Sequence, residues 1–303
     1  MPVRPLRRLD AATRNSLFDR ISREALHNAW GRSELDRLEA EHPDLVIERD
    51  GNVLAAFGAG LASLAYSYTS DGAFSDLFPS MFEDLLPGIR KELRADSVRF
   101  RLAYGSARPV VEPVLKKLWF SPEKPWLSFS LSRETVLPKF AAPKGVQFRD
   151  GGIDDVTELI RIDRDAFPDL PMPTPVLHAN IERGEGVLLA TIRGEVAGMA
   201  LYVHADPGEG YVRTLAVHSA HRGQGIGAAL TLRVAKRLFA EGATRIDLKT
   251  DDDNTNAIAL YRSLGFGHIG AGRDYRRPTD PATIAALAKK ASSGTMVRFG
   301  GWR

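Results

Sequence analysis

The alternation of hydrophobic and polar positions in the second half of the chain predicts a compact arrangement of strands and helices. Residues 187–203 contain two apolar runs on either side of a turn at Gly194, a pattern typical of a β-hairpin. The periodicity of the following residues predicts several further elements. They are, in chain order, a strand at 210–217, a helix ending near 241, a strand at 244–250, a short helix at 256–264 and a pair of strands after Phe266.

The first half of the chain shows the same order of elements in a weaker pattern. A hairpin is predicted at 45–58 around Gly51. The elements predicted after it are a helical segment at 74–93, a strand at 97–103, a short helix at 110–118 and a strand at 126–131. The turn glycines precede the ends of the last helical regions by 71 residues (265 − 194) and 68 residues (119 − 51). This spacing predicts an internal duplication, with the proline-containing residues 133–145 as the linker.

Composition narrows the classes of function. A length of 303 residues suits two domains, and 44% hydrophobic with 26% charged residues is typical of a globular protein. The formal net charge is only +3 without a concentrated basic stripe, so we expect no nucleic-acid partner. No run approaches the roughly 18 apolar residues that span a membrane, and no apolar stretch follows the basic N-terminus. We therefore expect a cytoplasmic protein without a membrane partner.

The sequence contains no cysteine, which excludes disulfides, thiolate metal sites and a cysteine nucleophile. The seven histidines show no spacing typical of a metal site, so we expect no metal. Any group transfer must therefore proceed without a cysteinyl intermediate.

Three alternating glycines, Gly223, Gly225 and Gly227, stand directly before a predicted apolar helix. The N-terminus of a helix presents unpaired N–H groups and roughly half a positive charge. Glycines without a Cβ allow an anion to approach those N–H groups, and Arg222 adds a forked cationic donor beside them. The pattern predicts a site for a phosphate-bearing ligand.

Two common phosphate motifs do not suit this segment. A P-loop needs a lysine after the glycines, and none is present. A dinucleotide fingerprint is matched by Gly223, Gly225 and Ala228, with Asp247 about 20 residues further on. However, only 75 residues (303 − 228) remain for the further strand–helix units of such a domain, and Asp247 lies inside a predicted strand. The dinucleotide interpretation is therefore disfavoured.

A second motif downstream supports a third interpretation. The two motifs consist, in chain order, of Arg222, Gly225 and Gly227, and then of Asn254, Ala257, Leu260, Tyr261, Gly265 and Phe266. They match R/Q-x-x-G-x-G/A and N-x-x-A-x-x-L-Y-x-x-x-G-F. Over residues 145–275 the chain thereby resembles the GNAT superfamily of acyl-CoA-dependent N-acyltransferases. The resemblance implies acetyl-CoA as co-substrate and direct transfer of its acetyl group to a primary amine.

The resemblance also implies an α/β (α+β) fold of two tandem GNAT-like domains, each with a mixed, mostly antiparallel central sheet flanked by helices. The expected division is a degenerate domain without a cofactor loop at 1–138, a catalytic domain at 139–278 and a C-terminal helix with its tail at 279–303. In the first domain Leu115 stands opposite Tyr261, and residues 69–82 are acidic and bulky where the glycines should be. The tandem arrangement is similar to that of the mycothiol synthases.

Individual residues receive roles from the same resemblance. The backbone N–H of Val217 is expected to stabilise the oxyanion, and Tyr261 to protonate the leaving thiolate. The residues expected to bind acetyl-CoA are Leu215, Ala216, Val217, Arg222, Gly223, Gln224, Gly225, Ile226, Gly227, Ala228, Asn254, Ala257 and Tyr261. Glu209, just before the central strand, is the expected general base, with Asp165 and His178 as alternatives.

Several properties stay open at the level of the sequence. The acceptor is expected to be a small-molecule or peptide amine, and the protein a monomer or a homodimer. An alternative function is a catalytically silent acyl-CoA-binding or sensor protein. The retained Tyr261 favours the enzyme, because a binding protein needs no general acid.

Overall fold

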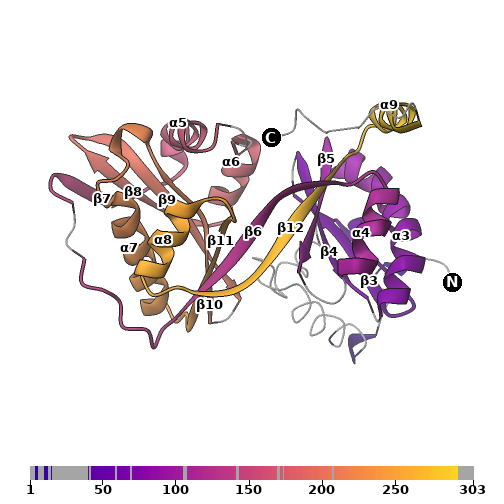
Figure 1. The fold of residues 1–303 in the computed structure, drawn as a ribbon, viewed down its shortest axis with the longest axis horizontal. Coiled ribbons are helices and arrows are strands. Elements are labelled where there is room, and N and C mark those ends of the chain that lie inside the picture. Colours follow the sequence, from indigo (N-terminus) through magenta and orange to yellow (C-terminus); the bar gives the residue numbers. More distant parts are fainter. Residues whose placement is uncertain are drawn as a thin grey trace. The chain divides into compact units, whose positions relative to one another are not determined.

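The computed structural model forms two compact units (Figure 1). The first unit holds the described residues up to Pro125 together with those from Ala271 onward, and the second unit is Trp126–Gly270. The residues that the structure describes are 4–5, 10–12, 15, 40, 42–58, 60–68, 70–104, 108–140, 143–168, 171–172, 174–206 and 208–292.

The first unit is built on a sheet whose strands are adjacent in the order β1-β2-β3-β4-β5-β12. In chain order its elements are β1 (Arg4–Pro5), η2 (Pro43–Leu45), β2 (Val46–Arg49), β3 (Asn52–Phe57), β4 (Leu61–Ser67), α3 (Asp71–Glu92), β5 (Ser97–Ala103), α4 (Arg108–Lys117), β12 (Gly267–Pro278) and α9 (Pro281–Ser292). Buried residues of α3 and α4 share one hydrophobic core with alternate residues of β5. Both helices therefore cover the same face of this sheet.

Helix α3 supplies much of the aromatic content of that core. Phe74, Phe78 and Phe82 are buried and lie four residues apart, so they form one stripe along the helix. The helix begins after Ser70, whose side chain accepts a hydrogen bond from the N–H of Ala73 at 3.1 Å. Such an N-cap satisfies one of the N–H groups that the first turn of a helix leaves unpaired.

The second unit is a sheet with helices on both faces and the strand order β6-β11-β10-β9-β8-β7. Its elements are β6 (Ser121–Ser132), β7 (Val146–Asp150), η3 (Ile153–Asp155), α5 (Val156–Ala166), α6 (Thr174–Glu182), β8 (Gly186–Ile192), β9 (Glu195–Asp206), β10 (Glu209–Val217), η4 (Ser219–His221), α7 (Ile226–Ala240), β11 (Arg245–Asp251) and α8 (Thr255–Ser263). Side chains alternate along β8. Leu188 and Ala190 join the core with α7 and α8, whereas Val187 and Leu189 join the core with α5 and α6.

The two units repeat one order of elements, as the sequence predicts. The series β2-β3-β4-α3-β5-α4 of the first unit corresponds to β8-β9-β10-α7-β11-α8 of the second. Strand β4 pairs with β5 in parallel, and β10 pairs with β11 in parallel, while the hairpins before them are antiparallel. Each sheet is therefore mixed and mostly antiparallel, which confirms the expected fold class.

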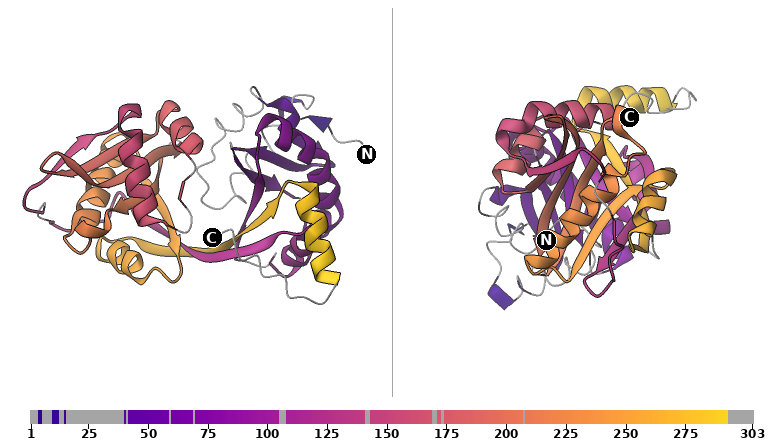
Figure 2. Two further views of the ribbon diagram at one scale, coloured as in Figure 1. Left: turned by 90° about the horizontal axis from the view of Figure 1, so that it is seen from above. Right: turned by 90° about the vertical axis from the view of Figure 1, so that its left-hand side faces the viewer.

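Strands β6 and β12 each have residues in both units (Figure 2). From Trp126 to Ser132, β6 pairs with β11, and from Gly272 to Pro278, β12 pairs with β5. The predicted pair of strands after Phe266 is thus one strand of 12 residues. The expected boundaries at 138 and 278 differ from this division, because each long strand continues unbroken while it passes from one unit to the other. The pattern of apolar and polar residues does not change where each strand passes from one unit to the other, so the sequence cannot predict that boundary.

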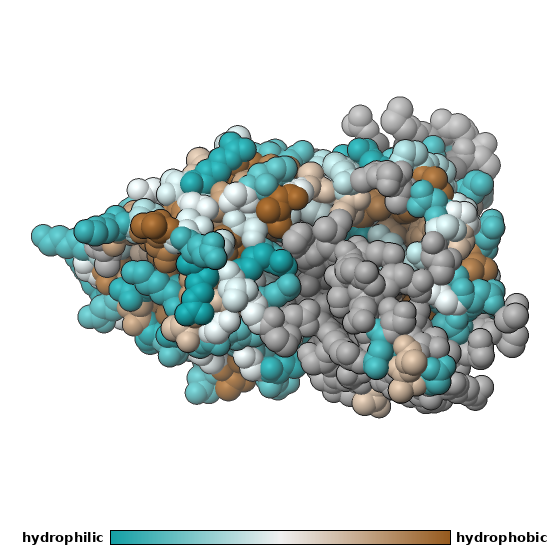
Figure 3. Space-filling model, turned by 90° about the horizontal axis from the view of Figure 1, so that it is seen from below, coloured by the Kyte–Doolittle hydropathy of each residue, from teal (hydrophilic) through white to brown (hydrophobic). Residues whose placement is uncertain are grey.

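Helix α9 follows Asp280, whose carboxylate accepts a hydrogen bond from the N–H of Thr283 at 2.8 Å. The last part of the expected tail, residues 293–303, lies outside the described residues. Within the described ranges, no helix is both long enough and apolar enough to cross a membrane. Figure 3 shows hydrophilic and hydrophobic residues interspersed over the part of the surface that is coloured.

Candidate active site

Strands β10 and β11 part in the middle of the second sheet. Their parallel pairing starts with Glu209 and Arg245 and ends with Val212 and Leu248. Beyond these residues β10 continues beside β9 and β11 continues beside β6. The register of β10 against β9 shifts between Val212 and Thr214, so Arg213 forms a bulge where the strands separate. The parting leaves one edge of β10 open.

The backbone of β10 presents N–H groups to this opening. The N–H of His218 donates to the carbonyl of Ala197 on β9 at 2.9 Å. Because successive N–H groups of a strand point to opposite sides, those of Val217 and Leu215 point away from β9. The carbonyl of Val217 points the same way, since it accepts a hydrogen bond from Nε of Arg222 at 3.1 Å. Two N–H groups of β10 are therefore directed into the opening.

Helix α7 begins directly beyond the end of β10. Its first intrahelical bond runs from the N–H of Ala229 to the carbonyl of Gly225 at 3.1 Å. The N–H groups of Ile226, Gly227 and Ala228 therefore have no acceptor within the helix. No described side chain caps this terminus, whereas side chains do cap α3 and α8. The side chains of Ile226 and Ala228 are buried, so only their backbone is available to a ligand.

Two of the three glycines around the start of α7 are required by the backbone. Gly223 has φ = 75° and Gly225 has φ = 80°, in the left-handed region that favours glycine. A Cβ at Gly225 would lie 2.9 Å from Cζ of Phe140, whereas a Cβ at Gly223 would meet nothing within 4 Å. Gly227 differs, because its Cβ would make an ordinary contact of 3.4 Å with Leu260.

Tyr261 on α8 is buried, with 6% of its surface exposed. Its ring centroid lies 6.1 Å from that of Phe129 and 5.8 Å from that of Phe266. Burial, and to a smaller extent the charge interaction with Tyr211, raises the pKa of its phenol far above the ordinary value. Tyr261 therefore keeps its proton at physiological pH. Tyr211 lies on β10 and belongs to neither of the two sequence motifs.

Asn254 and Ala257 of the downstream motif stabilise the start of helix α8. Asn254 is the N-cap of α8, and its side-chain oxygen accepts a hydrogen bond from the N–H of Ala257 at 3.1 Å. This contact explains the spacing of the asparagine and the alanine by the geometry of a capped helix. Binding of acetyl-CoA by these two residues stays a prediction. Gln224 Nε2 donates to the carbonyl of Ala220 at 3.5 Å, within the loop itself.

Glu209 is the first residue of β10, and Val217 is the last. At about 3.3 Å per residue the two are about 26 Å apart along the strand. The carboxylate of Glu209 accepts a hydrogen bond from Arg245 at 2.8 Å, and the Glu209 side chain is 38% exposed. The structure thus places Glu209 at the opposite end of β10 from the glycine loop, and its role as general base stays a prediction.

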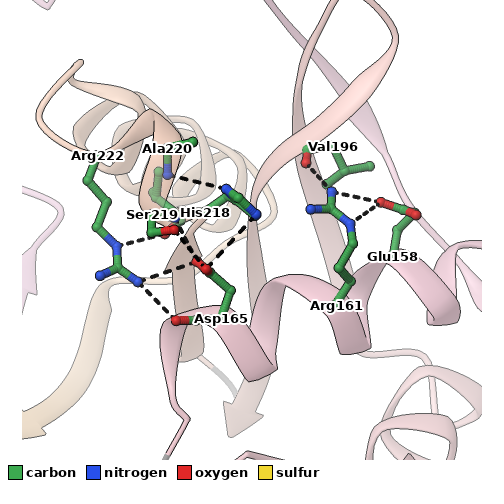
Figure 4. A network of polar contacts seen from close by, with 9 residues as sticks. Glu158, Arg161, Asp165, Val196, His218, Ser219, Ala220 and Arg222 are labelled. Carbon is green, nitrogen blue, oxygen red and sulfur yellow. Dashed lines mark hydrogen bonds and ion pairs between the residues drawn. The ribbon is translucent and has the colours of Figure 1, made fainter.

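The alternative base Asp165 belongs to a network around the loop (Figure 4). Its carboxylate accepts hydrogen bonds from the backbone N–H of Ser219 at 2.6 Å and from the hydroxyl of Ser219 at 2.7 Å. These bonds, and more weakly the charges of His218 and Arg222, lower the pKa of Asp165. A carboxylate with a lowered pKa is a poor proton acceptor. The remaining alternative, His178, lies half-buried on α6.

In the first unit the corresponding opening is filled. The parallel pairing of β4 with β5 ends at Ser63 and Arg99, although β4 continues beside β3. Tyr66 of β4 stacks on Phe100 of β5 with ring centroids 4.5 Å apart, and its hydroxyl donates to the carbonyl of Arg101 at 3.2 Å. The helix beyond it, α3, is capped and carries Asp71 and Asp76 in its first two turns, which disfavour an anion.

No group of three or more histidine, aspartate or glutamate side chains that could hold a metal ion occurs among the described residues. The second unit thus has unpaired backbone N–H groups and Arg222 beside the glycine loop, and a protonated phenol at Tyr261 on α8. Such a set suits the binding of a phosphate-bearing ligand and the transfer of a proton to a leaving group.

The family model described as Acetyltransferase (GNAT) family matches residues 153–266. This segment of the chain is therefore similar to GNAT domains. The matched segment runs from η3 to Phe266, just beyond α8. It therefore includes the parting strands, the glycine loop and Tyr261.

Solved structures extend the likeness from the GNAT domain to the whole fold. A GCN5-related N-acetyltransferase from Sphaerobacter thermophilus has a TM-score of 0.67 at 17% identity, with 92% of this chain and 96% of that chain covered. A tandem GNAT protein from the clavulanic acid biosynthesis pathway has a TM-score of 0.64 at 15% identity, covering 92% and 99%. A GCN5-related N-acetyltransferase from Kribbella flavida has a TM-score of 0.54 at 20% identity, covering 75% and 86%. The fold is that of two tandem GNAT-like domains.

Proposed function

We propose that the second unit transfers an acetyl group from acetyl-CoA directly to a primary amine. The observation that carries this proposal is the continuity between the open edge of β10 and the uncapped N-terminus of α7. A coenzyme A thioester has a diphosphate followed by an arm with two amide groups. The diphosphate suits a helix N-terminus, and the amides suit the edge of an unpaired strand.

The binding residues follow from this continuity. The N–H groups of Ile226, Gly227 and Ala228 receive the diphosphate, and Arg222 contributes its remaining guanidinium donors from the rim. The side chain of Arg222 is 53% exposed, so it is accessible to a ligand. The amide groups of the arm bind along β10, where the backbone of Leu215 and Val217 faces the opening.

The donor for the oxyanion lies on the same edge. The arm separates the thioester from the diphosphate, so the thioester lies further back along β10 than the glycine loop. The N–H of Val217 is the donor that the family resemblance implies, and the N–H of Leu215 is the next donor on that side. Removing one such donor costs about 3–4 kcal/mol of transition-state stabilisation in other enzymes.

Tyr261 acts as the general acid that protonates the leaving thiolate. Its raised pKa keeps the phenol protonated, and α8 holds it among buried aromatic rings. The attacking amine must be neutral. For a lysine-like amine with a pKa of about 10.4, deprotonation at pH 7 costs about 4.6 kcal/mol. The reaction therefore needs a route for the proton of the amine in addition to Tyr261.

A second candidate function is an acyl-CoA-binding protein without turnover. It is favoured because both carboxylates that could act as the general base already accept hydrogen bonds from other residues. Glu209 is bonded to Arg245, and Asp165 is bonded to Ser219. Neither carboxylate is free to accept the proton of an incoming amine in this arrangement.

Acetyl-CoA binding and turnover separate the two functions. Binding is measured by calorimetry, and turnover as CoA released with a panel of amines and peptides. The enzyme predicts binding with release for at least one amine, and loss of most release with normal binding in Tyr261→Phe. Tyr202→Phe is the matched control, because this buried phenol of β9 bonds Arg237 at 2.7 Å. Binding without release across the panel supports the binding protein, and absence of binding contradicts both.

A further inference from the structure

Asp165 connects helix α5 to the loop between β10 and α7. It is the penultimate residue of α5, and its carboxylate accepts two hydrogen bonds from Ser219, the first residue of η4. Figure 4 shows this side chain directed at the loop from the adjacent helix. A carboxylate at the first residue of a helical turn also interacts favourably with the unpaired N–H groups there. The start of the turn is therefore held from outside the loop.

The same aspartate holds the arginine that follows the turn. Nη2 of Arg222 donates to the backbone carbonyl of Asp165 at 3.3 Å and lies 3.6 Å from its carboxylate. Nε of Arg222 donates to the carbonyl of Val217 at 3.1 Å. A guanidinium has five N–H donors in a rigid fork, so fixing two of them sets the direction of the other three.

We propose that Asp165 is a positioning residue that aims the guanidinium of Arg222 at the diphosphate of the bound coenzyme A. It does so through Ser219, which fixes the turn, and through its own carbonyl and carboxylate, which fix the guanidinium. This inference rests on the proposed binding of acetyl-CoA.

Asp165 could instead weaken CoA binding, by neutralising the positive charge of Arg222. If its negative charge mainly neutralised Arg222, removing that charge would tighten the binding of an anion. The hydrogen bonds argue for positioning, because both donors of Arg222 that are engaged bind neutral carbonyl oxygens. Neutral carbonyl oxygens do not cancel the positive charge of Arg222, which can therefore attract the diphosphate. The carboxylate itself bonds Ser219 at a shorter distance than it approaches Arg222.

The test measures the dissociation constant of CoA by calorimetry, which requires no acceptor amine. Asp165→Ala removes both hydrogen bonds to Ser219 and the carboxylate beside Arg222, while the backbone carbonyl that accepts from Arg222 remains. We expect weakening by about tenfold, the size typical of lost charge-assisted hydrogen bonds. Asp165→Asn can keep both bonds with a neutral group, so we expect it to restore most of the affinity. Glu158→Ala is the matched control, because Glu158 also lies on α5 and pairs with an arginine, Arg161, at 2.8 Å. This control should bind CoA normally.

A double-mutant cycle separates positioning from general damage to the fold. If Asp165 acts through Arg222, then Asp165→Ala introduced into Arg222→Ala should change the affinity by less than about twofold. A tenfold loss of affinity when Asp165→Ala is added to Arg222→Ala overturns the inference. So does CoA binding by Asp165→Asn that is tighter than that of the unmodified protein, or binding by Asp165→Ala that equals it. Failure of the unmodified protein to bind CoA instead overturns the proposed function on which the inference rests.

Discussion

The hydroxyl of Tyr66 donates to the backbone carbonyl of Arg101 at 3.2 Å, across the place where β4 and β5 part. Its ring stacks on Phe100, so an aromatic side chain occupies the opening of the first unit. In the second unit the strands part in the same way, but the corresponding edge carries the N–H groups of Leu215 and Val217. One fold thus occurs twice, once with its opening filled by side chains and once with a strand edge that can receive a ligand.

Replacing Tyr66 should therefore affect stability and leave CoA binding unchanged. Tyr66→Ala removes a stacked ring, and we expect a loss of about 3 kcal/mol in the free energy of unfolding, measured in urea. Tyr66→Phe loses the hydrogen bond to Arg101 and keeps the stacked ring, with an expected cost of about 1 kcal/mol. A change in the CoA dissociation constant in either variant would contradict the expectation that the first domain lacks a cofactor loop.

Ionisation of Tyr261 should not limit turnover in the mildly alkaline range. The general acid is active when protonated, and its raised pKa moves the loss of that proton above the ordinary phenol value of 10.0. We therefore expect kcat to show no alkaline decline assignable to Tyr261 below about pH 10. The measurement is kcat against pH with saturating acetyl-CoA. A decline between pH 8 and 9 that is absent from the residual activity of Tyr261→Phe would contradict the environment described for this phenol.

Two glycines with nearly the same backbone conformation should respond differently to alanine. Gly223 and Gly225 both have φ close to 80°, so either substitution strains the backbone by about 1–2 kcal/mol. At Gly225 the new Cβ would also lie 2.9 Å from Phe140, next to the N-terminus of α7. We expect Gly225→Ala to lose more stability and more CoA affinity than Gly223→Ala. Thermal unfolding and calorimetry measure the two effects, and an equal response would show that Phe140 yields without cost.

Two carboxylates of the second unit should change stability in opposite directions. Burial raises the pKa of Asp163, so its charged form destabilises the fold as pH rises through that pKa. Asp163→Asn should therefore raise the unfolding temperature at pH 7, with the advantage shrinking in acid. The hydrogen bonds of Arg149 lower the pKa of Asp155, whose contribution is present at neutral pH and is lost as pH falls below about 3.9. Asp155→Asn should lower the unfolding temperature at pH 7. The same sign for both variants would contradict these environments.

Substitution of Glu209 decides whether it is the general base. The side chain lies at the first residue of β10 and accepts a hydrogen bond from Arg245, away from the glycine loop. From this position we expect Glu209→Gln to reduce kcat less than threefold, which is far below the factor of about 10²–10⁴ typical of general acid–base catalysis. A loss in that larger range, with unchanged Kd for acetyl-CoA, would restore the role that the sequence predicts.

The sequence by itself determined the features that depend on neighbouring residues. Alternation and helical spacing identified the hairpins, helix α7 and helix α8, because these elements bury one face at a fixed period. The glycines at 223 and 225 and the motif residue Asn254 also stood out in the sequence, although the positive φ of the glycines and the N-cap role of Asn254 came from the structure. A positive φ and an N-cap are satisfied within a few residues.

Only the tertiary structure decided the relations between distant residues. The parting of β10 from β11 depends on a bulge at Arg213 and on which strand each one continues to pair with. The hold of Asp165 on Ser219, 54 residues away, depends on how α5 packs beside the loop. The passage of β6 and β12 through both units likewise depends on pairing partners. Hydrogen-bond register and packing across a sheet are set by contacts between segments, and a period along one segment holds no information about them.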